Sequence, residues 1–186
     1  LGFAVYFTIE AKPVMLLLAG EGYAESIESM KWITPSIIFI GIGSITAWQL
    51  LIPLGRDKCT LFGAIVGAIV DFAVNWLLIP RYGAAGASIG TLCAEICVVI
   101  VHVIGLRDII NEFLDIHNII KICIGILLSV VALIGFNELF KLDSVFLTCV
   151  STALVFFLIY GITELALKER TILKGIGYLK TKIARI

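Results

Sequence analysis

The hydrophobic residues of the chain fall into six stretches, separated by short segments in which charged residues, glycine and proline gather. A helix needs about 20 predominantly apolar residues to cross the ~30 Å hydrocarbon layer of a bilayer, and each stretch approaches or exceeds that length. The pattern therefore predicts an all-α fold, a polytopic bundle of about six transmembrane helices. The expected spans are residues 1–18, 32–54, 61–79, 84–105, 119–136 and 145–167.

The third and fourth stretches predict a helical hairpin. A short charged loop with Arg56, Asp57 and Lys58 precedes the first helix. Residues 80–83 (PRYG) then predict a tight turn, because proline and glycine are strong turn signals.

Each helix of this hairpin carries a GxxxG pattern. The glycines are Gly63 and Gly67 in the first helix, and Gly86 and Gly90 in the second. Small residues let helix backbones approach closely inside a membrane, where the hydrophobic effect gives no help. We interpret both patterns as packing surfaces.

Composition excludes an ordinary soluble domain. The 186 residues are 60% hydrophobic and only 15% charged, against about 25% charged in a typical globular domain, and the mean hydropathy is +1.09. The formal net charge is zero, so nothing in it indicates a nucleic-acid partner. The chain begins inside an apolar run and without Met, and we expect it to be the C-terminal part of a longer protein.

The five cysteines lie mostly inside apolar runs, and no neighbouring ligands complete a metal set. We interpret them as small buried hydrophobes. No nucleophile elbow or phosphate-binding loop is present, so we expect neither a cofactor nor an enzyme.

The distribution of lysine and arginine predicts the topology. Placing the loops near residues 56 and 107 and the C-terminal tail on one side gives that side ten basic residues, against four elsewhere. The positive-inside rule then puts both termini of this chain in the cytoplasm. Residues 168–186 combine many basic residues with isoleucine and leucine at spacings of three and four, which predicts an amphipathic helix lying on the anionic inner leaflet.

Three polar residues interrupt the hairpin at a depth where lipid disfavours them, namely Asp71, Asn75 and Glu95. Asp71 and Asn75 share a helix face because they are four residues apart. Counting from the turn places Asp71 and Glu95 at similar depth. A charged side chain there costs about 2.5–3.5 kcal/mol even on lenient scales, so both should face the bundle interior or a water-filled cavity.

These residues are our candidates for binding substrate or a coupling ion, H⁺ or Na⁺. The alternative is a structural role, in which Lys12 of the first span pairs with Asp71. Lys12 is also a candidate for attracting an anionic headgroup. His102 lies seven residues after Glu95 on the same helix face, and we interpret it as a polar residue satisfied within the bundle, with a proton relay as the alternative.

Around this hairpin the sequence resembles the polysaccharide flippases of the MOP superfamily, the Wzx-type O-antigen and exopolysaccharide transporters related to MATE exporters. The resemblance rests on LGRDK at 54–58, on Asn75 before the Ile79-Pro80 dipeptide, on RYGAAGASIGT at 81–91, and on Glu95. The stretch LLLAGEGYAES at 16–26 is similar to the loop that precedes this region in the family. Asp71 departs from the family pattern, which more often has a neutral polar residue there.

The resemblance implies a MATE-like transporter of two six-helix lobes, of which the N-terminal lobe is missing here. Residues 1–105 would supply four helices of the second lobe, residues 106–167 two additional C-terminal helices, and residues 168–186 the basic cytoplasmic tail.

It also implies a function. The protein would move an undecaprenyl-diphosphate-linked oligosaccharide across a bacterial or archaeal cytoplasmic membrane by alternating access, for polysaccharide biosynthesis. Lys12, Asp71, Asn75 and Glu95 would form the polar interior, while Arg56 and Lys58 on the cytoplasmic rim would meet the diphosphate first.

Three other functions remain open from the sequence. One is a MATE-type multidrug or cation antiporter of the same superfamily. A membrane-embedded glycan-processing enzyme is disfavoured because the outer loops are short and poor in Arg and His. A non-transporting scaffold predicts that Asp71 and Glu95 tolerate alanine.

Overall fold

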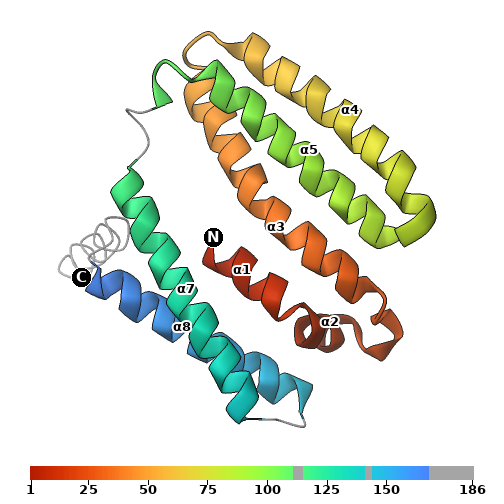
Figure 1. Cartoon of the computed structure of the whole chain (residues 1–186), viewed down its shortest axis with the longest axis vertical. Coiled ribbons are helices and arrows are strands. Elements are labelled where there is room, and N and C mark those ends of the chain that lie inside the picture. Colours follow the sequence, from red (N-terminus) through yellow and green to blue (C-terminus); the bar gives the residue numbers. More distant parts are fainter. Residues whose placement is uncertain (111–114, 141–143, 168–186) are drawn as a thin grey trace, which may run out of the picture. The chain divides into compact units, whose positions relative to one another are not determined.

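Helices make up every regular element in the part of the chain that the computed structural model describes, residues 1–110, 115–140 and 144–167 (Figure 1). Within these ranges five helices are long and apolar enough to cross a membrane, and a bent pair at the N-terminus makes a sixth span if it is counted as one. The prediction of an all-α transmembrane bundle is confirmed. The five spans are Ser26–Leu51, Asp57–Tyr82, Ala84–Gly105, Ile116–Leu139 and Val145–Ala166.

The first predicted span is not one straight helix. It consists of α1 (Gly2–Ile9) and α2 (Ala11–Ala19), which meet at Glu10 with a bend of 81°. Pro13 explains the break, because its ring lacks an N–H and collides with the carbonyl four residues earlier, at Ile9. Pro13 instead occupies the first turn of α2, where a missing N–H costs nothing.

The second span begins earlier than predicted. α3 runs over Ser26–Ser44 and continues without a break into a π-helical segment, Ile45–Leu51. Hydropathy finds only the apolar part, whereas the first turn is polar: Glu28 accepts hydrogen bonds from Lys31 at 3.2 Å and from the Trp32 indole at 3.1 Å.

The hairpin consists of α4 (Asp57–Tyr82) and α5 (Ala84–Gly105). The prediction of a turn over 80–83 is wrong by three residues, because α4 continues through Pro80 and Gly83 alone joins the two helices. Gly83 has φ +54° and ψ −129°, a conformation open to glycine and costly for other residues.

The GxxxG glycines are all buried at the α4–α5 contact. A Cβ atom at Gly86 would lie 2.6 Å from the Leu78 backbone, and one at Gly67 would lie 2.6 Å from the Val98 side chain. The two helix backbones therefore approach more closely than any side chain at these positions would allow. α5 also packs on α3, so α5 lies between α3 and α4 (Figure 1).

The chain divides into two compact units between residues 113 and 114. The first contains α1 to α5. The second is a helical pair, α7 (Ile116–Leu139) and α8 (Val145–Ala166). In this pair Gly125 of α7 lies against the buried carboxyl of Glu164 on α8.

Large apolar side chains cover the outer surface of the spans. Phe72 is 70% exposed, Trp76 73% and Leu127 63%. A soluble monomer rarely exposes a contiguous apolar patch of more than a few hundred Å², so this surface faces lipid or other membrane helices. The protein is a multi-pass membrane protein.

Candidate functional site

A groove opens on α5 between α3 and α4, with a volume of about 520 Å³. Its depth comes from small residues, which leave space between the helices: Gly43, Ala47, Ala64, Gly67, Ala68 and Ala94. Polar side chains reach the same groove from all three helices. These are Ser44, Thr60, Asp71, Thr91, Glu95 and His102.

Asp71 and Asn75 act as one unit on α4. The Asn75 Nδ2 amide donates to Asp71 Oδ2 at 3.0 Å, as their spacing of four residues predicts. The other carboxylate oxygen of Asp71, Oδ1, and the amide oxygen of Asn75, Oδ1, are both buried and have no hydrogen-bond partner within the described residues. Asp71 therefore retains a free acceptor in the groove.

Asn75 has room only because α5 carries Gly90 opposite it. A Cβ atom at Gly90 would overlap Asn75 Oδ1. Gly90, in the RYGAAGASIGT run, thus has a specific partner in Asn75. Because Gly90 has no side chain, α5 can approach the Asn75 amide that donates to Asp71.

Glu95 reaches the same groove from α5, and it is partly exposed. The structure thus brings together Asp71 and Glu95, which the sequence placed at similar depth. No lysine or arginine of the described chain lines the groove, so the groove is acidic when these carboxyls are ionised.

His102 lies at the end of the groove nearer the start of α4, with 2% of its surface exposed. Its Nδ1 is 2.9 Å from the Thr46 hydroxyl, which belongs to the π-helical segment. Thr46 Oγ1 is also 2.9 Å from the Ile42 carbonyl and 3.0 Å from that of Gly43.

The Thr46 hydroxyl has one proton, and the backbone carbonyls receive it. We therefore assign His102 Nδ1 as the donor to Thr46 Oγ1, which leaves the lone pair of the neutral ring on Nε2. Nε2 is buried without a hydrogen-bond partner in the described structure, and it lies against Gly63, where a Cβ atom would be 2.9 Å away.

Lys12 does not join this group. It is exposed on α2 and does not line the groove. Its predicted pairing with Asp71 has no support among the described contacts.

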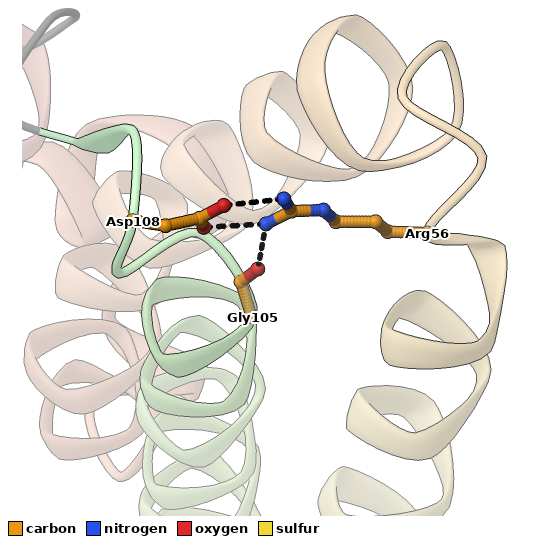
Figure 2. A network of polar contacts seen from close by, with 3 residues as sticks. All are labelled: Arg56, Gly105 and Asp108. Carbon is orange, nitrogen blue, oxygen red and sulfur yellow. Dashed lines mark hydrogen bonds and ion pairs between the residues drawn. The ribbon is translucent and has the colours of Figure 1, made fainter.

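Arg56 and Lys58, expected at the cytoplasmic rim, lie at the start of α4. Arg56 binds the far end of α5, as Figure 2 shows: Nη1 donates to the Gly105 carbonyl at 2.7 Å, and both Nη atoms donate to the Asp108 carboxylate at 2.5 Å. Lys58 is exposed. Arg56 thus caps α5 and holds the loop before α4 in place. Its guanidinium, which was expected to meet a diphosphate, is therefore already bound within the protein.

The ion pair between Arg56 and Asp108 shifts the pKa of each group in the direction that favours its charged form. The hydrogen bond from Arg56 lowers the pKa of Asp108 to about 2, and the same bond raises the pKa of Arg56. Both side chains are partly exposed, so the pair fixes geometry more than it adds stability.

Thr60, Thr91 and Ser44 also line the groove, and none of them was predicted from the sequence. A periodic pattern in the sequence indicates two of them. Spacings of four, three and four separate successive groove residues on each helix of the hairpin: Thr60, Ala64, Gly67 and Asp71, and likewise Thr91, Glu95, Val98 and His102. Each set is one face of a helix. Asp108 carried no such signal, since it lies 52 residues from Arg56.

The described residues contain no group of three or more His, Cys, Asp or Glu that could hold a metal ion, and their cysteines are free. Comparison of the chain with protein-family models, with curated proteins and with solved structures finds no match.

Proposed function

We propose that the protein is a flippase for an undecaprenyl-diphosphate-linked oligosaccharide, working by alternating access in a bacterial or archaeal cytoplasmic membrane. The observation that supports this most is the groove, in which six polar side chains from three otherwise apolar helices face one cavity. Polar groups inside a membrane bundle cost free energy and mark substrate or ion pathways.

The groove suits the sugar part of such a substrate. Carboxylates and hydroxyls bind sugar hydroxyl groups through hydrogen bonds, and the indole of Trp48 at its edge is 71% exposed. The absence of basic residues from the described lining disfavours the diphosphate there. In this proposal the diphosphate binds outside the groove, where exposed Lys58 and Arg107 lie close to the start of α4 and the end of α5.

The resemblance in sequence supplies the rest of the proposal. A first lobe, from the remainder of the protein, covers the groove from the other side, and the two lobes open alternately to each face of the membrane. Both termini of this chain are cytoplasmic, as the distribution of Lys and Arg indicates.

Asp71 and Glu95 couple transport to an ion gradient. Binding of H⁺ or Na⁺ neutralises the groove, and an ion that binds one open state more tightly shifts the equilibrium toward that state. The free Asp71 Oδ1 in the groove provides an oxygen ligand of the kind that hard cations prefer.

One observation favours a second candidate, a MATE-type cation or drug antiporter. Two carboxyls with no basic residue in the described groove attract cationic compounds as well as a coupling ion. A drug antiporter predicts changed resistance to cationic drugs and normal glycan export when the protein is absent.

The test is deletion of the full-length protein in its host, followed by complementation with wild type, Asp71→Asn or Glu95→Gln. We expect lipid-linked oligosaccharide to accumulate on the cytoplasmic face, and wild type alone to restore export. Asp57→Asn is the matched control, because Asp57 is an exposed carboxylate of α4 outside the groove. Normal export in the deletion strain contradicts the proposal.

A further inference from the structure

Two buried polar atoms at one end of the groove lack partners in the described structure: Nε2 of His102 and Oγ1 of Thr60. Both residues line the groove. An unpaired buried polar group costs free energy and calls for an explanation, such as a bound ligand group.

Thr60 differs in this respect from the other threonines. A threonine in a helix usually donates its hydroxyl to the carbonyl of the preceding turn. Seven threonines of the described chain do so, namely Thr8, Thr34, Thr46, Thr91, Thr148, Thr152 and Thr163. Thr60 keeps its hydroxyl proton available.

The two atoms belong to facing surfaces of α4 and α5. His102 Nε2 lies against Gly63 of α4, and Thr60 precedes Gly63 by three residues, which places it on the same face of α4. Gly63 is buried there without a side chain, so the ring meets no α4 side chain at that position, and Thr60 lies one turn before it in the same groove lining.

The chemistry of the pair selects the ligand. Nε2 of the neutral ring accepts a hydrogen bond, because Nδ1 holds the proton and donates to Thr46. The Thr60 hydroxyl can donate one. A phosphate oxygen offers no proton to Nε2, and an ammonium group offers no lone pair to Thr60, whereas an alcohol both donates and accepts.

We propose that Thr60 and His102 form a subsite of the groove that binds a hydroxyl group of the transported glycan. This subsite rests on the proposed function, and it names a contact with the substrate at the end of the groove away from Asn75. Asp71 of α4 and Glu95 of α5 are the carboxyls that share the groove with it.

Substitution of His102 by asparagine or by glutamine tests the roles of its two ring nitrogens separately. His102→Asn keeps an amide near the position of Nδ1, where it donates to Thr46, and loses the group at Nε2. His102→Gln places an amide near Nε2 and loses the donor to Thr46. Thr60→Val removes the hydroxyl and keeps the shape, whereas Thr46→Val removes the partner of Nδ1 on the other side of the ring.

The experiment measures transport by the full-length protein in proteoliposomes, with lipid-linked oligosaccharide extracted from the deletion strain as the probe. We expect Thr60→Val and His102→Asn each to raise the half-saturating concentration of the probe about fivefold, the effect of losing one hydrogen bond worth about 1 kcal/mol. His102→Gln should stay near the wild-type value.

Each other result overturns the subsite. Impairment by His102→Gln and Thr46→Val, with normal transport by His102→Asn, shows that only the bond to Thr46 matters. Equal loss in both His102 variants, together with loss of the pH dependence of transport, shows a proton carrier. Wild-type behaviour of all variants shows that a water molecule satisfies the pair. Absence of transport by the wild type itself contradicts the proposed function, and the glycan subsite with it.

Discussion

Arg56 shows how one side chain can connect segments that are distant in sequence. Its guanidinium reaches a carbonyl at the end of α5 and a carboxylate beyond it, in the geometry that arginine makes with two parallel hydrogen bonds. The connection joins the two ends of the α4–α5 hairpin that lie opposite Gly83, so both ends of the hairpin are fixed.

This pair makes a prediction about pH. The folded pKa of Asp108, about 2, lies below the ordinary value of 3.8, so its contribution to stability is present above the ordinary value and is lost as the pH falls through about 2. We expect the protection of backbone amides 106–110 from hydrogen exchange, corrected for intrinsic rates, to be constant between pH 5 and pH 8.

The matching substitution is Asp108→Asn, which removes the charge that Arg56 binds. Exchange of the same amides should become several-fold faster, and the exposed Asp57→Asn should leave it unchanged. A wild-type protein that loses protection between pH 8 and pH 5 would contradict this assignment.

Asn75 and Gly90 make a second prediction at the scale of single residues. Gly90→Ala places a methyl group on Asn75 Oδ1, so the amide must turn away and release Asp71. We expect Gly90→Ala to reduce transport markedly in the wild-type background. In an Asn75→Ala background the collision no longer exists, and Gly90→Ala should then add little.

A double-mutant cycle measures this coupling directly. The full-length protein is assayed for lipid-linked oligosaccharide transport in all four combinations. If the effects of Gly90→Ala and Asn75→Ala are additive, the close contact between them has no functional role.

At the scale of the helices, the single-residue turn between α4 and α5 is the feature most sensitive to substitution. Gly83 has φ +54° and ψ −129°, and a residue with a Cβ atom pays about 1–3 kcal/mol in such a conformation. Gly83→Ala should lower the free energy of unfolding by this amount in mixed detergent. Gly41→Ala is the control, because Gly41 is helical and a Cβ atom there meets nothing within 4 Å; equal stability of the two variants would be the contrary result.

The helices could be predicted from hydropathy, and their ends could not. Runs of apolar residues identify the membrane part of each helix, which is why five of the six expected spans are found in the expected order and a bent pair stands in place of the first. The polar turn at Glu28 and the continuation through Pro80 depend on hydrogen bonds and on backbone geometry, to which a hydropathy pattern is blind. The break at Glu10 lies inside a predominantly apolar run, so hydropathy predicts one span there, and Pro13 is the residue that breaks it.

The candidate site, too, could be predicted from the sequence only in part. Asp71, Asn75 and Glu95 stand out in sequence because charge and amide groups are rare in such runs. The structure places Asp71 and Glu95 in one groove, and Asn75 outside its lining but hydrogen-bonded to Asp71. Thr60 and Ser44 are compatible with any helix surface, so their position became evident only when three helices were packed together. The partner of Arg56 required the three-dimensional course of the loop that contains Asp108.

At the scale of the whole molecule, the first unit has two different surfaces. α4 presents Ile69, Phe72 and Trp76 outward, exposed to 63%, 70% and 73%, while Ala68 and Asp71 of the same helix face the groove. Lipid can cover the first surface. The groove, in contrast, needs water or a polar substrate, and we claim that it forms a polar path through the membrane part of the protein.

Cysteine accessibility tests this claim with two adjacent positions at nearly the same depth. Ala68→Cys lies in the groove and Ile69→Cys on the apolar surface, each made in the full-length protein after its native cysteines have been replaced. In native membranes we predict that a membrane-impermeant, charged thiol reagent labels Ala68→Cys and leaves Ile69→Cys unlabelled, and that lipid-linked oligosaccharide slows the labelling. Equal labelling of the two positions, or labelling of Ile69→Cys alone, would contradict a polar path through this groove.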